Sequence, residues 1–441
     1  MKSNILIIGS GAREHAIARA IAASSKPHQL YCYGSGPNPG ILPLCLGYQV
    51  GSLHEPRAIA DYARAHAVDF AIVGPEAALA AGVVDALRQK GINAIGPSQK
   101  SAQIESSKGF TRDLMQKYKV PGAPRYQRFT AVNAEAHKFL QALGEDFVVK
   151  ADGLMSGKGV KISGEHLADH AEAIAFCQEL NSPFVLEEKL RGVEFSLLSF
   201  SDGKNLIHMP PVQDHKRAYS GDIGPNTGGM GSYTMADHSL PFLDPEDVLA
   251  AQEINEAAVT ALQTELNEQY QGILYGGFMK TAGGVKLIEY NARFGDPEAI
   301  NLLGLLESDF IDICHAMING SLNEDHVKFK KQASVCKYLV PKGYPDAPER
   351  GLLDISQVNH LDRLYYAGVE QAEQGLLMTG SRAIAVLGVA DDLQLAEQQA
   401  ESTLNQIAGP AFHRPDIGTC ALVNQRIEII NQLTEADYPL L

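Results

Sequence analysis

One glycine-rich segment reads Lys150-Ala151-Asp152-Gly153-Leu154-Met155-Ser156-Gly157-Lys158-Gly159-Val160. It starts at the end of an apolar run, Phe147–Ala151, which predicts a buried strand, and Gly159–Ile162 predicts a second strand. A Walker loop has one more residue between its first two glycines, a hydroxyl residue after its lysine, and a helix after the loop. The segment therefore predicts a hairpin whose backbone N–H groups and lysines close over a triphosphate, with a solubilising surface hairpin as the alternative.

The residues around this hairpin predict a small separate unit. A helix is expected at Phe110–Lys119, ending before Pro121. The hairpin then leads to a helical stretch at Glu165–Leu180 and a strand at Phe184–Glu188. These elements predict an α+β unit of roughly 70 residues. We place it at about 121–191 and interpret it as a mobile lid.

The first hundred residues alternate between strand and helix patterns. Strands are expected at Asn4–Ile8, Asp69–Val73 and Ile92–Ile95, and helices at Arg13–Ala23 and Ala77–Lys90. This alternation predicts a doubly wound parallel sheet, and ligands bind such sheets beyond the carboxyl ends of the strands. We assign residues 1–105 to this substrate-binding domain.

The rest of the chain predicts two further parts of mixed α/β pattern. The part 192–330 follows the small unit and completes a region of 106–330, and a C-terminal domain covers 331–441. Strands are expected at Glu194–Phe200, Leu206–Met209, Ile273–Thr281, Val285–Tyr290, Ala333–Val340 and Ala383–Gly388, and helices at Pro245–Leu266 and Leu393–Ile407. The segment Ser220–Ser232 is so rich in glycine that a loop is expected there.

Composition restricts the class of protein. Hydrophobic residues make up 45% of the chain and charged residues 20%, as in globular proteins. The formal net charge of −15 disfavours non-specific nucleic-acid binding. No apolar run reaches the ~18 residues of a membrane span, and the apolar start is too short for a signal peptide. The six cysteines form no Cys-x-x-Cys pair, which favours a reducing cytoplasm.

The segment Gly9-Ser10-Gly11-Ala12-Arg13-Glu14-His15 lies between a predicted strand and a predicted helix. Such a turn can hold phosphate on the amides of the helix start, and Arg13 and His15 add donors there. The sixth position of a dinucleotide-binding loop is glycine, but here it is Glu14, which disfavours a dinucleotide oxidoreductase. Phosphate binding and a plain tight turn both remain open.

Two charged segments follow in the central part. The first reads Glu187-Glu188-Lys189-Leu190-Arg191-Gly192-Val193-Glu194, and its carboxylates could hold ribose hydroxyls or simply protect a strand edge. The second reads Asp214-His215-Lys216-Arg217 and leads into Gly224-Pro225-Asn226-Thr227-Gly228-Gly229-Met230-Gly231. This second segment suits a loop whose backbone approaches a charged small molecule, and a disordered surface loop is the alternative.

A metal site is predicted in the segment Lys286–Glu298. Side chains alternate along a strand, so Glu289 and Asn291 share a face. Two oxygen ligands suit Mg²⁺ when phosphates and water complete its octahedron. Arg293 lies on the same face if the strand continues, where it could neutralise a transferring phosphoryl group.

Four segments in the same order resemble the phosphoribosylamine–glycine ligase family, also called glycinamide ribonucleotide synthetases. They are Gly9–Ala16, Lys150–Val160, Gln213–Tyr233 and Glu289–Glu298. The resemblance implies an ATP-grasp fold that is α/β and α+β, with an N-terminal doubly wound sheet and a C-terminal mixed domain. It also implies that 106–330 is the ATP-grasp region and that 192–330 is its central catalytic part. It implies that ATP and Mg²⁺ or Mn²⁺ serve to join glycine to 5-phosphoribosylamine through glycyl phosphate, in de novo purine synthesis.

The resemblance also implies roles for single residues. The residues expected to hold ATP are Lys108, Lys150, Gly157, Lys158, Gly159, Glu187, Glu188 and Glu194. The metal ligands are Glu289 and Asn291, and the catalytic residues are Arg293, Lys216, Asp214 and Arg217. The residues expected at the substrates are Gly9, Gly11, Arg13, His15, Glu76, Asp296 and Pro297.

Other readings stay open at this point. A different ATP-grasp ligase, such as a carboxylating purine enzyme, would share the lid and the metal strand but lack the Asp214–Gly231 run. A nucleotide-binding regulatory module would be expected to lack Glu289 or Lys150, and both are present. We expect small-molecule substrates, no nucleic-acid or membrane partner, and a monomer or weak homo-oligomer.

Overall fold

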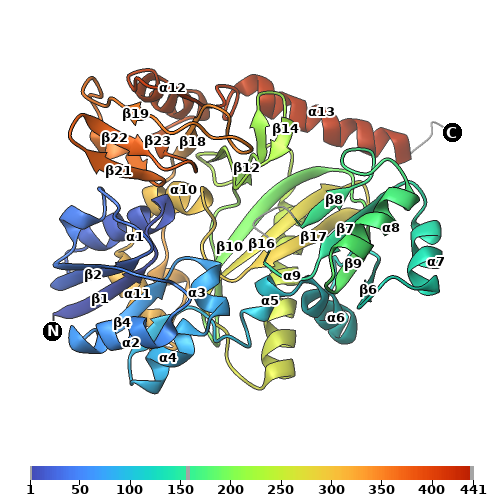
Figure 1. The fold of residues 1–441 in the computed structure, drawn as a ribbon, viewed down its shortest axis with the longest axis horizontal. Coiled ribbons are helices and arrows are strands. Elements are labelled where there is room, and N and C mark those ends of the chain that lie inside the picture. The colour runs from blue at the N-terminus through green and yellow to red at the C-terminus, as the bar shows by residue number, and fades with distance from the viewer. Residues whose placement is uncertain (1, 155–158, 438–441) are drawn as a thin grey trace.

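The computed structural model describes residues 2–154 and 159–437. Its N-terminal part is a five-stranded parallel sheet in the order β3-β2-β1-β4-β5 (Figure 1). The strands are β1 (Ser3–Ile8), β2 (His28–Gly34), β3 (Gly47–Val50), β4 (Phe70–Val73) and β5 (Asn93–Ile95). The helices are α1 (Ala12–Ala22), α2 (Pro56–Ala65), α3 (Glu76–Ala80) and α4 (Val83–Gln89), with a 3-10 turn, η1 (Leu42–Leu44). The strand order reverses between β1 and β4, and such a switch point opens a ligand crevice at the carboxyl ends of the strands.

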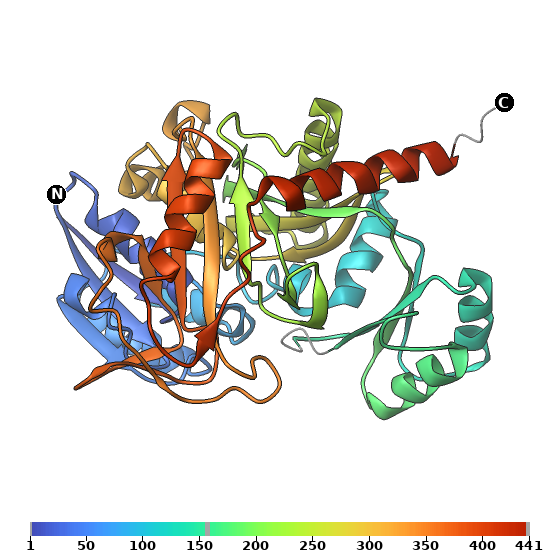
Figure 2. The ribbon, with the colours of Figure 1, turned by 90° about the horizontal axis from the view of Figure 1, so that it is seen from above.

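A second sheet forms a small unit at the opposite end of the molecule from the N-terminal sheet (Figure 2). It is antiparallel, in the order β6-β9-β7-β8. Its elements are β6 (Tyr126–Phe129), α7 (Ala134–Leu143), β7 (Phe147–Ala151), β8 (Val160–Ile162), α8 (His170–Glu179) and β9 (Phe184–Glu188). The helices α5 (Gln103–Ser106) and α6 (Lys108–Tyr118) connect the first sheet to this unit. The unit has a hydrophobic core of its own, built around Phe129, Phe147 and Phe184.

The central sheet is antiparallel, in the order β11-β10-β16-β17. Its strands are β10 (Val193–Asp202), β11 (Leu206–His208), β16 (Gln271–Thr281) and β17 (Gly284–Asn291). The helices of this part are α9 (Pro245–Leu266), α10 (Glu298–Leu305) and α11 (Phe310–Asn319), with a 3-10 turn, η2 (Glu324–His326). The β16–β17 register pairs Gly277 with Glu289 and Phe278 with Leu287, so Ile288 is an extra residue in an edge strand. A bulge of this kind re-aims the groups beside it.

The C-terminal strands share a sheet with two strands from the central part. Its path runs β12-β15-β18-β23-β20, and β24 pairs with β18. The strands are β12 (Gln213–Asp214), β15 (Gly231–Thr234), β18 (Ala333–Pro341), β20 (Leu364–Tyr366), β23 (Ile384–Ala390) and β24 (Ala411–Phe412). The remaining elements are the hairpin β13 (Arg217–Tyr219) and β14 (Ile223–Asn226), the small sheet β19 (Leu352–Leu353), β21 (Val369–Ala372) and β22 (Gly375–Met378), η3 (Leu361–Arg363), α12 (Leu393–Leu404) and α13 (Cys420–Asp437). The C-terminal strands therefore extend, in one sheet, the strands that contain Asp214 and Gly231.

Three local predictions are wrong. The helix expected at Glu165–Leu180 begins only at His170, because Asp169 caps its N-terminus and Leu167 forms a bridge with Ser163. The single helix expected at Ala77–Lys90 is two helices, because Gly82 adopts a left-handed φ of 86° between α3 and α4. The loop expected at Ser220–Ser232 contains β14 and the start of β15. Its glycines do not prevent strand formation here because β13 and β18 supply the backbone partners. No helix in the described part of the chain has the length and apolar character to cross a membrane.

His15 joins the N-terminal and C-terminal parts. Its ring stacks on Tyr366 at a centroid distance of 5.5 Å, and its Nδ1 accepts a hydrogen bond of 3.0 Å from the Tyr366 backbone N–H. The side chain is buried, and this desolvation, with the charge of Arg19, lowers the pKa of His15 to about 3. His15 is therefore neutral in the folded protein at pH values where a histidine of the unfolded chain is already charged.

A fall in pH from 7.5 to 5 is expected to destabilise the fold through this residue. In the unfolded chain the imidazole of His15 binds a proton below about pH 6.5, whereas in the folded protein it stays neutral down to about pH 3. The free energy of unfolding therefore falls as the pH falls. His15 alone contributes about 2 kcal/mol to this loss at pH 5. Denaturant unfolding at both pH values should show that the free energy of unfolding falls less in His15→Asn than in the parent protein, by that amount. The exposed His54→Asn should leave the loss unchanged, and an equal loss in His15→Asn and the parent protein would contradict the prediction.

Candidate active site

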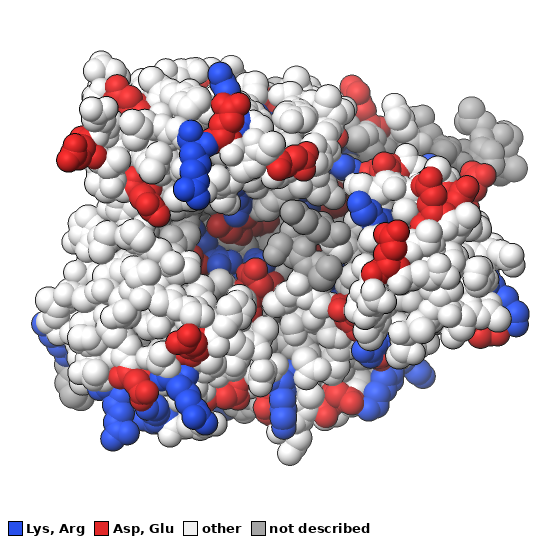
Figure 3. All heavy atoms as spheres, in the orientation of Figure 1, with Lys and Arg blue, Asp and Glu red and all other residues white. Residues whose placement is uncertain are grey.

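A cavity of about 560 Å³ opens where the parts of the chain meet. The N-terminal part, the small unit, the central sheet and the C-terminal part all contribute lining residues. Figure 3 shows the hollow in the middle of one face, with basic and acidic atoms inside it. Equal numbers of acidic and basic side chains line the cavity, although the whole chain carries a net charge of −15. The local charge therefore does not oppose an anionic ligand.

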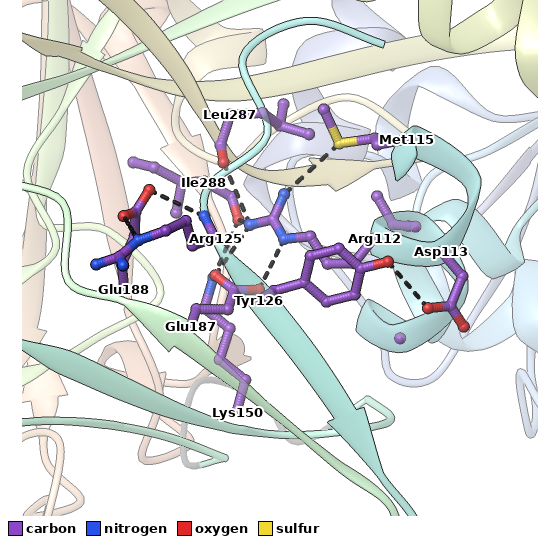
Figure 4. A network of polar contacts seen from close by, with 12 residues as sticks. Arg112, Asp113, Met115, Arg125, Tyr126, Lys150, Glu187, Glu188, Leu287 and Ile288 are labelled. Carbon is purple, nitrogen blue, oxygen red and sulfur yellow. Dashed lines mark hydrogen bonds and ion pairs between the residues drawn. The ribbon is translucent and has the colours of Figure 1, made fainter. Parts of the chain in front are cut away.

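One end of the cavity is built around Glu187 (Figure 4). Arg112 donates from Nε and Nη2 to the two Glu187 carboxylate oxygens, at 2.7 and 3.0 Å. Lys150 Nζ forms an ion pair with Glu187 Oε2 at 2.7 Å. Burial opposes ionisation of Glu187, but the charges of Arg112 and Lys150 outweigh it and lower the pKa to about 2. Glu187 is thus a buried carboxylate held by two cations.

The other residues predicted to hold ATP are distributed as follows. Lys108 and Gly159 line the cavity, and Lys108 Nζ donates to the Gly153 carbonyl at 3.1 Å. Glu188 alternates with Glu187 along β9 and pairs with Arg125 outside the cavity, at 2.8 Å. Glu194 is half-exposed and pairs with Lys216 at 2.8 Å. Gly157 and Lys158 lie outside the described residues.

The two predicted metal ligands both line the cavity. Burial disfavours the charged form of Glu289, but Lys216, Lys108, Lys150 and Arg293 together hold its pKa below the ordinary value. Asn291 Oδ1 accepts a hydrogen bond of 3.3 Å from Arg293 Nη2. One carboxylate and one amide oxygen fit Mg²⁺, which takes few protein ligands when it also binds phosphates.

Arg293 lies between two carboxylates. Its Nη2 forms an ion pair of 2.9 Å with Glu105, and its Nε lies 3.4 Å from a Glu76 oxygen. The Nε is buried and makes no hydrogen bond among the described residues. Within 2–154 and 159–437, the only close partner of this N–H is therefore the Glu76 carboxylate, and Arg293 is held in place by Glu76 and Glu105 at the edge of the cavity.

A second cluster surrounds Asp214 and Lys216, which both line the cavity. Burial raises the pKa of Asp214 to about 7, with Lys216 opposing the shift and Glu298 adding to it. Glu298 accepts a hydrogen bond of 3.0 Å from Tyr275 Oη. Arg217 does not line the cavity, and it pairs instead with Glu165 of the small unit.

The N-terminal glycine turn is closed by its own helix. The Gly11 N–H donates to Glu14 Oε2 at 2.6 Å, and a Cβ on Gly9, whose φ is 115°, would approach the Glu14 side chain to 2.8 Å. Arg13 reaches the cavity while donating to Glu14 and to the Phe294 carbonyl. Of the predicted substrate residues, Arg13, Glu76 and Asp296 line the cavity, whereas Gly9, Gly11, His15 and Pro297 do not.

The C-terminal part supplies one wall through Tyr344, Ser381 and Arg382. Arg382 Nη1 donates to the carbonyls of Gly228, Gly229 and Asp296, at 2.6, 3.0 and 2.9 Å. Its guanidinium lies 4.3 Å from the centroid of the Tyr338 ring, and Tyr338 Oη donates to Asp296 Oδ1 at 2.5 Å. Sequence patterns did not predict Arg112, Glu105, Tyr338 or Arg382, because none of them lies in a recognisable motif.

Sequence relatives decide the family. A phosphoribosylamine–glycine ligase of Methanosarcina barkeri is 47% identical over 435 residues, which cover 97% of this chain and 99% of the relative. The chain belongs to the phosphoribosylglycinamide synthetase family. Models of the family's N domain, ATP-grasp (A) domain and C domain match residues 3–105, 106–299 and 334–420. The predicted family is thus confirmed, and the chain is an ATP-dependent ligase.

Solved structures agree with this placement in the phosphoribosylglycinamide synthetase family. The chain is similar to a phosphoribosylamine–glycine ligase from Thermotoga maritima, with a TM-score of 0.78, 27% identity, and 94% and 99% of the two chains covered. An N5-carboxyaminoimidazole ribonucleotide synthetase from Thermotoga maritima matches with a TM-score of 0.63 and 15% identity. The match covers 92% of this chain and 99% of the synthetase, and at this identity it shows a shared fold alone. The predicted fold class, an ATP-grasp protein with an N-terminal parallel sheet, is confirmed.

Proposed function

We propose that this chain uses ATP to join glycine to 5-phosphoribosylamine, giving glycinamide ribonucleotide, ADP and phosphate in purine synthesis. The observation that carries the proposal is a single cavity that joins Lys150 and Glu187 to Glu289 and Asn291, and these to Asp214 and Lys216. The names of the relatives support the same reaction.

The chemistry has two steps. A glycine carboxylate oxygen attacks the γ-phosphorus of ATP, the bond to ADP breaks, and glycyl phosphate forms. The amine nitrogen of phosphoribosylamine then attacks the glycyl carbonyl carbon, the bond to phosphate breaks, and the nitrogen loses a proton. Phosphorylation is needed because a free carboxylate has no good leaving group, and the protein contributes mainly positioning and charge neutralisation.

The cavity residues suit these steps. Lys108, Lys150 and Gly159 lie where they can hold the phosphates, and we retain the 121–191 unit as the lid over them. Glu289 and Asn291 would hold Mg²⁺ or Mn²⁺, which neutralises phosphate charge. The Arg293 guanidinium lines the same cavity and can neutralise the phosphoryl group or the acyl phosphate, with Asp214 and Lys216 near glycine.

The remaining assignments are extensions of this proposal. We place the phosphoribosyl group between Arg13 and Glu76 on one side and Asp296 on the other, because these residues line one cavity. All six cysteines are free thiols, which suits a reducing compartment, so we propose a cytoplasmic enzyme. For the oligomeric state, a monomer or a weak homo-oligomer stays a prediction.

ADP release with each substrate omitted in turn tests the reaction. We expect ADP to form at full rate only when glycine, phosphoribosylamine, ATP and Mg²⁺ are all present, because the acyl phosphate needs both acid and amine to turn over. Bicarbonate in place of glycine should give only background. Equal rates with bicarbonate would replace the proposal with a carboxylating activity, which the similarity to the N5-carboxyaminoimidazole ribonucleotide synthetase fold makes the relevant alternative.

A further inference from the structure

Arg112 lies on α6, outside the segments to which the sequence assigned chemistry, yet it connects the small unit to the central sheet. Its Nε and Nη2 donate to Glu187 on β9, and the same Nη2 donates to the carbonyls of Leu287 and Ile288 on β17, at 3.2 and 2.7 Å (Figure 4). The side chains of Arg112 and Glu187 are each only 3% exposed. The guanidinium therefore fixes one lid strand against the strand that carries Glu289.

Arg112 and Lys150 share two acceptors. Glu187 Oε2 receives Arg112 Nη2 and Lys150 Nζ, and the Ile288 carbonyl receives the same two nitrogens, at 2.7 and 3.1 Å. The Ile288 carbonyl accepts both because Ile288 is the bulge residue of an edge strand. An ammonium has three donors, so one N–H of Lys150 remains for a ligand after these two contacts.

The charges of this cluster determine what Lys150 can do. Two cations and one carboxylate leave one net positive charge beside the cavity. If Arg112 were absent, Glu187 and Lys150 would neutralise each other, and the ammonium would lose most of its attraction for a phosphate. Buried ion pairs add little net stability to a fold, so stability alone does not explain why two cations surround one carboxylate. Binding of an anionic ligand explains the second cation better.

We propose that Arg112 is a positioning residue for the nucleotide: by neutralising Glu187 it leaves the charge of Lys150 free for an ATP phosphate. This inference rests on the proposed function for the identity of the ligand. In this role Arg112 does not touch the nucleotide and acts through Glu187 and Lys150. A purely structural bridge would depend on the shape of the side chain, whereas this role also requires the positive charge of Arg112.

Binding of MgADP, measured by calorimetry on the full chain, tests the charge argument. Arg112→Met should weaken MgADP binding by at least about tenfold, because one net charge next to the phosphates is lost. The double variant Arg112→Met/Glu187→Gln restores the net positive charge and should bind MgADP more tightly than Arg112→Met. Arg112→Lys keeps the charge and should stay within about threefold of the parent. In all of these variants the KM values for glycine and phosphoribosylamine should change little.

Arg125 provides the matched control. It pairs with Glu188, the neighbour of Glu187 on the same strand, but its side chain is 64% exposed. Arg125→Met should therefore leave MgADP binding unchanged. The proposal is overturned if Arg112→Met binds MgADP as well as the parent, or if the double variant binds no better than Arg112→Met. Where Arg112→Met does not fold, an Arg112→Lys variant with tenfold weaker binding overturns it instead.

These outcomes separate this inference from the proposed function. MgADP binding by the parent chain needs neither glycine nor phosphoribosylamine, whereas the substrate-omission assay needs both. A parent chain that binds MgADP but forms no ligase product would contradict the reaction and leave the Arg112 argument standing. A parent chain with full ligase activity and an Arg112→Met variant of unchanged MgADP affinity would contradict only the role of Arg112.

Discussion

Glu289→Gln is expected to lower turnover by at least about a hundredfold. Glu289 lies in the cavity, where four cations hold its pKa below the ordinary value, so it is ionised at neutral pH. It is also the only carboxylate of the Glu289–Asn291 pair, and a neutral amide is a far weaker ligand for Mg²⁺. The variant should therefore need much higher Mg²⁺ for ADP release in the presence of glycine and phosphoribosylamine.

The fold should survive this change. Glutamine has the shape of glutamate, and removing a buried charge also removes its desolvation penalty. The melting temperature of Glu289→Gln should therefore stay within a few degrees of the parent. Glu265→Gln, which breaks a surface pair with Lys117, is the control and should keep full activity. Near-normal turnover of Glu289→Gln at low Mg²⁺ would remove Glu289 from the metal site.

Arg382→Met is expected to lower kcat/KM for phosphoribosylamine about a hundredfold. Arg382 holds the Gly228–Gly229 backbone against Asp296, and three carbonyls and a carboxylate lose a donor when it is replaced. These groups surround one wall of the cavity, and small displacements of positioning groups have large effects on rate. The loss should also cost about 3 kcal/mol of stability, because the mostly buried Asp296 carboxylate loses its cationic partner and keeps only Tyr338 of its described partners.

MgADP binding distinguishes this effect from general damage. Arg382 makes no contact with the Arg112–Glu187–Lys150 cluster among the described residues, so the MgADP affinity of Arg382→Met should equal that of the parent. Arg363 lies in the same C-terminal part but donates only weak contacts, at 3.4 and 3.5 Å, and Arg363→Met should change neither property. An Arg382→Met variant with unchanged kcat/KM for the amine would contradict a role of the C-terminal wall in the reaction.

The sequence predicted those elements whose pattern is local. Phe147–Ala151, Phe184–Glu188 and Pro245–Leu266 match the structure at both ends, because apolar runs and a proline at the helix start mark them clearly. The strands β2 and β3 and the helix α2 were not predicted. The segment His28–Gly34 mixes polar and apolar residues, and Gly47–Val50 is only four residues long, so neither has a clear strand pattern. The two strands form by pairing, β2 with β1 and β3 with β2.

The site was predictable only where its residues belong to a motif. Glu289 and Asn291 stand two apart on one strand, so sequence places them together, and the structure has both in the cavity. Glu187 and Arg112 are 75 positions apart and meet only through tertiary packing. The family resemblance placed Arg217 among the catalytic residues beside Lys216, but Arg217 lies outside the cavity and pairs with Glu165 of the small unit, a contact made only by tertiary packing.

The fate of a glycine carboxylate oxygen tests the central claim most directly. If glycine is activated as glycyl phosphate, one of its carboxylate oxygens must leave with the phosphate when the amide forms. Turnover with glycine labelled by ¹⁸O in the carboxylate, followed by mass spectrometry of the released phosphate, should show one ¹⁸O atom per product molecule. Released phosphate without ¹⁸O from fully labelled glycine would contradict the account.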